Sequence, residues 1–309
     1  MKTRVFVIAA ARPNFMKVAP LWRAFEERAD LFAPSLVHTG QHYDQNMSDV
    51  FFEDLGLPRP HFHLGVGSGS HAEQTAEMLK GIEAVLVREL PDSVLVYGDT
   101  NSTLAAALAA AKLGVPVAHI EAGLRSFNRS MPEEINRIVA DHVSDMLFAP
   151  TQTAIENLEA ENLGKASYLV GDVLLDALLF NRELASERTD VLARFGLEGL
   201  AFGVVTIHRA GNTDSKRLES LLTAINTVAD DLPIVFPVHP RTVARIREDC
   251  PTWEPHANLR LVSPLGYVDF VRLFDAASVV LTDSGGLQKE AYFVATPCVT
   301  LRDETEWPE

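Results

Sequence analysis

The sequence predicts an α/β protein with two doubly wound, Rossmann-like domains that face a central cleft, and three observations lead to this prediction. Short apolar segments alternate with helical segments of ten or more residues, as in parallel βαβ units. The alternation runs through two cycles, and the charged stretch Glu183–Asp190 suits a hinge region. Six strands are each followed by a chargeable side chain, at the strand ends where open α/β sheets bind ligands. We predict domains at residues 1–170 and 171–309.

The first cycle contains five predicted strands, each a short run of apolar residues. They are Val5–Ala10, Ser35–His38, Ser93–Tyr97, Pro116–Ile120 and Met146–Ala149. Helical periodicity and end signals predict the helices Met16–Arg28, Asn46–Leu55, Ser70 to about Glu89, and Ser102–Leu113, with two more beginning near Glu133 and at Thr151 or Thr153. Ser70 and Glu73 have the spacing of a capping box at the start of their helix. Gly114 ends the helix Ser102–Leu113.

The second cycle repeats this pattern after about residue 165. Its predicted strands are Ala201–Ile207, Pro233–Pro237, Leu259–Val262, Val279–Thr282 and Pro297–Leu301. Its predicted helices are one after Gly171-Asp172, then Ser215–Ala229, Val243–Glu248, Tyr267–Ala276 and Gly286–Phe293. The chain stops at Trp307-Pro308-Glu309, directly after a buried strand, so we expect a final helical segment to be absent from it.

Composition limits the class of partner. Among 309 residues, 27 are basic and 42 acidic, and the net charge of −15 argues against nucleic acid as a partner. No run approaches the roughly 18 apolar residues that a membrane span needs, and Arg12-Pro13 directly follows a first apolar run too short for a signal peptide. Cys250 and Cys298 lack the spacing of a disulfide or metal motif, so we expect them reduced and the protein cytoplasmic.

One segment, residues 119–137, packs three carboxylates and three arginines between a strand and a helix. The strand delivers Glu121 to its carboxyl end, and Pro132 suits the first turn of the helix. Glu133 and Arg137 share a helix face, so we expect Arg137 to orient Glu133, whereas we expect Glu134 to be solvated. A capped, salt-bridged surface helix would explain this segment equally well on its own. The polar residues elsewhere favour a functional site.

Other strands end in residues that could bind an anion or move a proton. These residues are Arg12 and Lys17, Asp99, Glu121, His208-Arg209, His239 with Arg241, and Asp283-Ser284. Ser284, Gly285 and Gly286 open a helix whose N-terminus could bind phosphate, although a plain N-cap is the alternative. Glu290 could accept hydrogen bonds from ribose hydroxyls.

The sequence excludes several kinds of site. A GxGxxG motif after the first strand and a Walker A motif are both absent, and no Ser or Cys has the setting of a nucleophile. His61, His63 and His71 lack a carboxylate or thiol that would complete a metal site, so we predict no metal. Asp99, Glu121, Glu133 and His208 are the best candidates, and carboxylates with an imidazole suit proton transfer.

Seven motifs together resemble the non-hydrolysing UDP-N-acetylglucosamine 2-epimerases, over essentially the whole chain. They are Ala10-Ala-Arg-Pro13 with Lys17, Tyr97-Gly-Asp-Thr100, His119-Ile-Glu-Ala-Gly-Leu-Arg125, Pro132-Glu-Glu-Ile-Asn-Arg137, His208-Arg209, Asp283-Ser-Gly-Gly286 and Leu301-Arg-Asp-Glu-Thr-Glu306. The resemblance implies the two-domain glycosyltransferase-B-like fold and a homodimer that acts in cell-wall polysaccharide biosynthesis. It also implies interconversion of UDP-GlcNAc and UDP-ManNAc without a cofactor: the C2 proton is removed as UDP leaves C1, and UDP adds back to the resulting 2-acetamidoglucal.

The same resemblance assigns roles to individual residues. Proton transfer and departure of the leaving group would fall to Asp99, Glu121, Glu133 and His208. The diphosphate and nucleotide would be held by Arg12, Lys17, Ser284, Gly285, Gly286 and Arg302, with Phe270 against the uracil and Glu290 on the ribose. Arg137 and His239 would also contact substrate.

The chain departs from the family pattern at several positions. Asn14 replaces a glutamate, and Ala210-Gly211-Asn212 replaces the usual sequence after His208-Arg209. Glu73-Gln74 replaces the Arg-Gln of substrate-activated bacterial members, which argues against activation by UDP-GlcNAc. Thr39-Gly-Gln-His42 and Phe51-Phe-Glu53 look more like the branch that epimerises UDP-2,3-diacetamido-2,3-dideoxy-glucuronate. A glycosyltransferase of the same fold and a UDP-sugar-binding protein without activity are the other readings.

Overall fold

A computed structural model describes residues 1–10, 12–40, 52, 55–207, 212 and 215–302. The chain packs as two compact units, Met1–Ala177 and Leu178–Glu309. The division falls within helix α7, Val173–Arg188, so most of the charged stretch Glu183–Asp190 is helical. The predicted boundary between residues 170 and 171 stays a prediction.

The first unit is built on a seven-stranded sheet in which every neighbouring pair is parallel. Its order is β3-β2-β1-β4-β5-β6-β7. The strands are β1 Thr3–Ala9, β2 Phe32–His38, β3 Phe62–His63, β4 Ser93–Tyr97, β5 Val117–Ile120, β6 Met146–Ala149 and β7 Ser167–Leu169.

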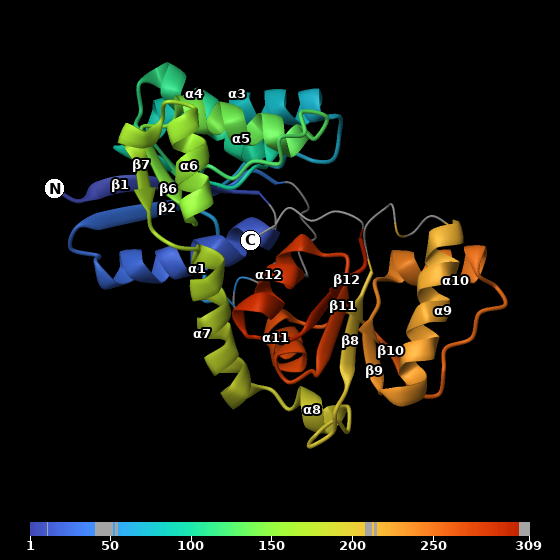
Figure 1. The fold of residues 1–309 in the computed structure, drawn as a ribbon. Helices are drawn as coiled ribbons and strands as arrows, with labels where there is room; N and C mark the ends of the chain where they lie inside the picture. The colour runs from blue at the N-terminus through green and yellow to red at the C-terminus, as the bar shows by residue number, and fades with distance from the viewer. Residues whose placement is uncertain (11, 41–51, 53–54, 208–211, 213–214, 303–309) are drawn as a thin grey trace. The chain divides into compact units, whose positions relative to one another are not determined.

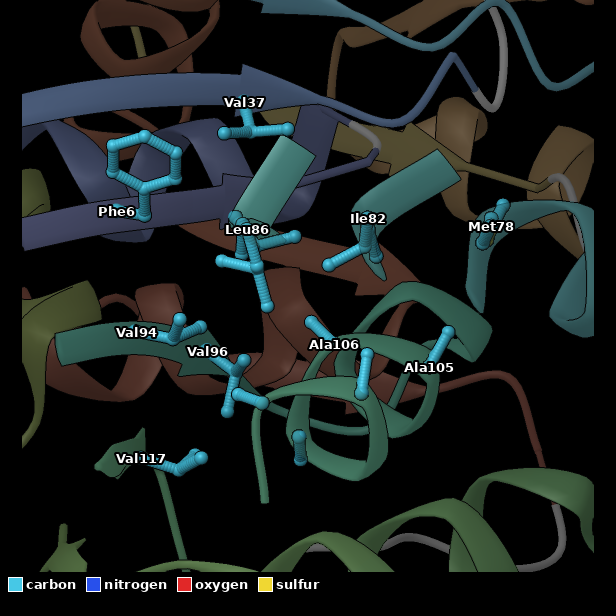
Figure 2. Packing of buried hydrophobic residues seen from close by; sticks show 14 of the residues in the cluster. Phe6, Val37, Met78, Ile82, Leu86, Val94, Val96, Ala105, Ala106 and Val117 are labelled. Carbon is cyan, nitrogen blue, oxygen red and sulfur yellow. The ribbon is translucent and has the colours of Figure 1, made fainter. Parts of the chain in front are cut away.

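Helices cover both faces of this sheet, with α3, α4 and α5 together on one face and α1 on the other (Figure 1). They are α1 Arg12–Glu27, α3 His71–Glu89, α4 Asn101–Leu113, α5 Pro132–Val143 and α6 Gln152–Ala160. Phe6, Val94 and Val96 of the sheet pack against Met78 and Ile82 of α3 and against alanines of α4 (Figure 2). Small alanine side chains let α4 lie close to the strands, so the sheet has a dense core beneath it.

The second unit has a five-stranded parallel sheet of order β10-β9-β8-β11-β12. Its strands are β8 Gly203–Thr206, β9 Ile234–Pro237, β10 Leu259–Val262, β11 Val279–Thr282 and β12 Cys298–Thr300. Helices α9 Ser215–Asp231 and α10 Pro240–Asp249 lie on one side of it, and α11 Tyr267–Asp275 and α12 Gly285–Phe293 on the other (Figure 1). The short helix α8, Val191–Arg194, precedes the sheet.

Strand order reverses once in each sheet, between β1 and β4 in the first and between β8 and β11 in the second. The crossover connections leave in opposite directions at such a switch point, which opens a crevice beyond the carboxyl ends of the two strands. Asp99 follows β4, and Asp283 follows β11. The fold therefore brings candidate residues to the place where a doubly wound sheet binds ligands.

The sequence predicted every strand except β3 and β7, which have two and three residues and little periodicity to detect. Several helix ends are confirmed in detail. Ser70 and Glu73 form the reciprocal capping box of α3, Gly114 ends α4 with φ +70°, and Thr151 rather than Thr153 caps α6. The predicted helix Asn46–Leu55 lies largely outside the described residues.

The prediction for Glu134 was wrong. Glu134 is buried, and its carboxylate accepts hydrogen bonds from the Ser126 backbone N–H at 2.7 Å, the Ser126 hydroxyl at 2.9 Å and the Phe127 N–H at 3.1 Å. Glu133 is the exposed member of the pair. The buried face of α5 is polar, since it carries Glu134, Arg137 and Asp141, so hydrophobic periodicity could not reveal which glutamate faces inward.

Both cysteines are free, in agreement with the sequence. Among the helices that the structure describes, none has the length and apolar composition required to span a membrane.

Replacing Glu134 by Gln should destabilise the protein by about 1.5 to 3 kcal/mol, because the amide NH₂ would face a backbone donor that the carboxylate now satisfies. The matched Glu133→Gln change, on the exposed neighbour, should alter stability by less than about 0.5 kcal/mol. Chemical denaturation of the two variants measures the difference. Equal stability of both variants would contradict the burial and bonding of Glu134.

Candidate active site

Glu121 adopts an unusual backbone conformation at the end of β5. Its φ is +66°, in the left-handed region that strains a residue with a Cβ, and its side chain is buried. The N–H groups of Glu121 and Ala122 both donate to the Phe148 carbonyl, each at 3.1 Å, so β5 leaves its ladder with β6 here. Strain of this kind persists where the surrounding contacts over-determine the backbone, and it clusters at functional sites.

The Glu121 carboxylate forms a largely buried ion pair with the Lys17 ammonium of α1. Gly98, which follows β4, closes the other side of this pair. A Cβ on Gly98 would lie 2.9 Å from Glu121 Oε2 and 3.4 Å from Lys17 Nζ, and Gly98 has φ +61°. Glycine is thus required at position 98 by both space and backbone conformation.

Asp99, the next residue, is held by α5. Its carboxylate pairs with the Arg137 guanidinium, and Arg137 Nη1 also donates to the Glu121 carbonyl at 2.7 Å. Burial alone would lower the pKa of Arg137, but Asp99, Glu121 and Asp141 together raise it, so the guanidinium stays charged. Arg137 therefore fixes Asp99 and Glu121. The prediction that it orients Glu133 was wrong, because its guanidinium binds Asp99 and the Glu121 carbonyl, whereas Glu133 is exposed.

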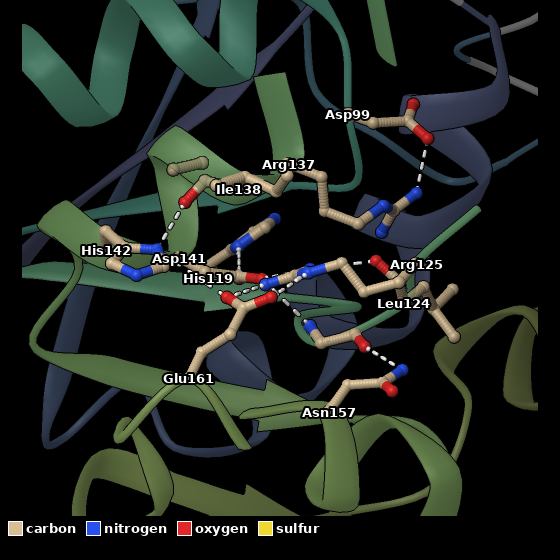
Figure 3. A network of polar contacts seen from close by, with 12 residues as sticks. Asp99, His119, Leu124, Arg125, Arg137, Ile138, Asp141, His142, Asn157 and Glu161 are labelled. Atoms are coloured by element: carbon tan, nitrogen blue, oxygen red, sulfur yellow. Dashed lines mark hydrogen bonds and ion pairs between the residues drawn. The ribbon is translucent and has the colours of Figure 1, made fainter. Parts of the chain in front are cut away.

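A second group of polar and charged residues, His119, Arg125 and Glu161, is centred on Asp141 of α5 (Figure 3). The Asp141 carboxylate accepts from His119 Nδ1 at 2.6 Å, Arg125 Nη1 at 2.7 Å and the Gly123 N–H at 3.1 Å. Arg125 also binds Glu161 through two contacts of 2.7 Å. Burial opposes ionisation of Asp141, yet His119 and Arg125 hold its pKa below the usual value.

The second unit places a helix N-terminus beside buried polar groups. The Ser284 hydroxyl caps α12 by accepting from the Leu287 N–H at 3.3 Å, as the sequence predicted for a helix opened by Ser284, Gly285 and Gly286. Asp283 is fully buried, and Asn212 Nδ2 bridges its carboxylate at 3.0 Å and the Leu301 carbonyl at 2.8 Å. Arg302 Nη1 reaches the Asp283 carbonyl at 3.5 Å. The amide dipoles of α12 and the Arg302 charge favour an anion here.

Glu290 lies further along the same helix and is buried with an unusual partner. The Tyr267 hydroxyl of α11 donates to Glu290 Oε1 at 2.6 Å. Burial raises the pKa of Glu290 to about 7, although the Tyr267 hydrogen bond acts in the opposite direction. Glu290 is therefore a carboxyl group that can hold or release a proton near neutral pH.

The remaining candidates are less defined by contacts. Phe270 is half-buried on α11, with its ring centroid 5.5 Å from that of Phe274, and His239 is exposed directly before α10. Arg12 begins α1, and His208 lies outside the described residues. Over the described parts of the chain, no three His, Cys, Asp or Glu side chains form a group that could hold a metal ion.

Sequence reasoning missed the residues that hold the candidates in place. Gly98 was visible only as part of a motif, and its close approach to Glu121 depends on the neighbouring strand. Asn212, Tyr267 and Asp141 come from segments distant in sequence from the side chains they bind. A polar residue on the inner face of an amphipathic helix was the one signal that could have indicated Asp141.

Gly98→Ala should lower the free energy of unfolding by about 1 to 2 kcal/mol, because alanine is strained in the left-handed backbone conformation of Gly98. The added Cβ should also displace the Glu121 carboxylate, so we expect loss of activity. Gly196→Ala is a matched control, since Gly196 has the same φ of +61° with no atom within 4 Å of an added Cβ. Unfolding and turnover are measured for both variants. We expect similar destabilisation but loss of activity only at position 98, and equal activity of the two would contradict the packing against Glu121.

Glu290→Gln should change how stability depends on pH. The folded pKa of about 7 lies above the ordinary value of 4.5, so between these values the unfolded chain ionises first and the free energy of unfolding falls as pH rises. The free energy of unfolding should fall by up to about 3 kcal/mol as pH rises through this range, and the Glu290→Gln variant should not show this fall. Tyr267→Phe should extend the loss to higher pH, because it removes a hydrogen bond that favours ionisation. Melting curves from pH 4 to about 9 test both; parallel curves for wild type and Glu290→Gln would contradict the assignment.

Comparison with known proteins places this geometry in a family. The sequence profile of the UDP-N-acetylglucosamine 2-epimerase family matches residues 23–309. A UDP-2,3-diacetamido-2,3-dideoxy-D-glucuronate 2-epimerase of Pseudomonas aeruginosa is 48% identical over 99% of this chain and 85% of its own length. A UDP-N-acetylglucosamine 2-epimerase homolog of Methanococcus maripaludis is 47% identical, with the same two coverages.

A solved structure agrees with these matches. The crystal structure of the Methanocaldococcus jannaschii UDP-GlcNAc 2-epimerase, in complex with UDP-GlcNAc and UDP, has a TM-score of 0.87 and 43% identity. The match covers 99% of this chain and 86% of that one. The chain belongs to the UDP-N-acetylglucosamine 2-epimerase family.

Proposed function

We propose that this protein interconverts UDP-GlcNAc and UDP-ManNAc by removing and returning the proton at C2 of the sugar. The observation that carries the proposal is the strained, buried Glu121 beside Asp99 at the switch point of the first sheet. The nearly full-length match to 2-epimerases supports it. Removal of a proton from a weakly acidic C–H bond requires a carboxylate that is held in place and shielded from water, and Glu121 is buried and fixed by its contacts.

The reaction proceeds in two stages in this proposal. A carboxylate takes the C2 proton while the C1–O bond breaks and its electrons leave with UDP, so that a C1–C2 double bond forms in 2-acetamidoglucal. The UDP oxygen then adds back to C1 as a proton is delivered to the opposite face of C2. Glu121 is the proposed base and Glu133 the proposed acid on the other face, with Asp99 and His208 assisting proton transfer and departure of UDP.

Both units contribute residues proposed to hold the nucleotide. In the second unit, the N-terminus of α12 at Ser284, Gly285 and Gly286, with Arg302, would stabilise the charge that develops on the diphosphate. In the first unit, the family resemblance gives the same role to Arg12 and Lys17. Glu290 would accept hydrogen bonds from the ribose, Phe270 would lie against the uracil, and His239 and Arg137 would complete the contacts. Lys17 pairs with Glu121 and Arg137 pairs with Asp99, so the two cations would also reduce the negative charge that these carboxylates present to the substrate.

A second substrate has specific support. The Pseudomonas aeruginosa relative that is 48% identical carries the name of a UDP-2,3-diacetamido-2,3-dideoxy-D-glucuronate 2-epimerase. The C2 chemistry would be the same on that sugar, with differences confined to the C3 and C6 substituents. The cytoplasmic location and the homodimer stay predictions that accompany the proposed function.

The test is proton NMR of UDP-GlcNAc incubated with the protein in D₂O, and of the diacetamido sugar in parallel. We expect the C2 proton signal to disappear as the 2-epimer forms, without added metal or NAD. Glu121→Gln should slow this exchange by at least about 100-fold while UDP still binds, because it removes the proposed base. Glu290→Gln should instead weaken UDP binding.

Each alternative predicts a different result. A glycosyltransferase would leave C2 untouched and would need an acceptor, whereas a binding protein would bind UDP without exchange in the wild type. Full retention of the C2 proton on both bound sugars would contradict the epimerase proposal.

A further inference from the structure

The backbone on both sides of Glu121 is tied to one buried carboxylate. Asp141 Oδ1 accepts from the ring of His119, two residues before Glu121, and Asp141 Oδ2 accepts from the Gly123 N–H, two residues after it (Figure 3). Both His119 and Asp141 are fully buried. Asp141 therefore fixes both the ring of His119 and the backbone of Gly123.

The other ring nitrogen of His119 reaches the neighbouring strand end. His119 Nε2 lies 2.7 Å from the Gly98 carbonyl, which can only accept, so Nε2 must carry a proton. Gly98 N–H donates to the Ile120 carbonyl at 3.0 Å. Both backbone groups of Gly98 are thereby held by β5 and its histidine, next to the Glu121 carboxylate and directly before Asp99.

Asp141 orients the ring of His119 from its other side. Its carboxylate lies 2.6 Å from Nδ1 and also accepts from Arg125 and from the Gly123 N–H, so the carboxylate is itself held in place. Arg125 in turn pairs with Glu161, which completes this buried set.

We propose that His119 is a positioning residue for the proton-transfer carboxylates, acting through the Gly98 carbonyl. The imidazole ring, oriented by Asp141, donates from Nε2 to the Gly98 carbonyl, fixes the turn at Gly98 and so sets the place of Asp99 and the space open to Glu121. The inference rests on the proposed epimerase function, and His119 itself, being fully buried, touches no substrate.

Two substitutions separate the contacts of His119. An Asn side chain places its amide nitrogen near the position of Nδ1, so His119→Asn keeps the hydrogen bond to Asp141 and loses the hydrogen bond to the Gly98 carbonyl. A Gln side chain places its amide nitrogen near the position of Nε2, so His119→Gln keeps the hydrogen bond to the Gly98 carbonyl and loses the one to Asp141. Both variants replace the imidazole ring by an amide and leave comparable defects in the buried set.

We expect kcat of His119→Asn to fall by about 10- to 100-fold, with KM and UDP affinity unchanged, because the carboxylates shift while the nucleotide contacts remain. His119→Gln should keep kcat within about threefold of wild type. Melting temperatures of the two should fall together. Equal kcat in both variants, or a loss confined to KM, would overturn the inference and leave His119 a structural residue.

A measurement on the wild type holds even where a variant does not fold. ¹⁵N NMR of labelled histidines, with His119 identified from the signal lost in His119→Gln or by direct assignment, should show a proton on Nε2 at neutral pH. An unprotonated Nε2 overturns the inference, because His119 could not then donate to Gly98. Absence of C2 exchange in the wild type would instead contradict the proposed function, and the nitrogen signals would still decide whether His119 holds Gly98.

Discussion

The left-handed backbone at Glu121 is the feature on which the candidate site depends. A residue with a Cβ at φ +66° costs about 1 to 2 kcal/mol, so the surrounding contacts must hold it there. They do so from three directions: Asp141 accepts from the Gly123 N–H two residues later, Arg137 binds the Glu121 carbonyl, and Lys17 binds its carboxylate. Substitution of any of these three side chains should therefore displace Glu121.

Charge neutralisation is arranged in layers around this residue. Lys17 pairs with Glu121 and Arg137 pairs with Asp99, while Arg125 pairs with both Asp141 and Glu161. Burying an unpaired charge is far more costly than burying a pair with its hydrogen bonds complete. Such pairing lets the first unit concentrate carboxylates at one sheet edge and still fold. The second unit uses a different solution, since Glu290 is buried beside a tyrosine and its pKa rises to about 7.

Much of the fold followed from local sequence signals, because parallel strands in this chain are short, apolar and bounded by caps. The candidate site followed from one further rule, that ligands meet the carboxyl ends of strands, which drew attention to Asp99, Glu121 and Ser284. Glu133 and Glu134 show where such reasoning ends. Both lie in the first turn of α5, and only the packing of a polar helix face decides that Glu134 is buried and Glu133 exposed. The contacts of Gly98 and Tyr267 likewise depend on tertiary neighbours that no local pattern encodes.

The central claim is that Glu121 removes the C2 proton, and a crystal structure of this protein with a bound UDP-sugar tests it most directly. Proton abstraction requires the carboxylate to approach C2 closely before reaction, at about 3 to 3.5 Å. We predict that a Glu121 oxygen is the basic atom nearest to C2, with Glu121 still in the left-handed conformation. A sugar whose C2 lies against another base, or a Glu121 that has relaxed to an extended backbone, would contradict the account.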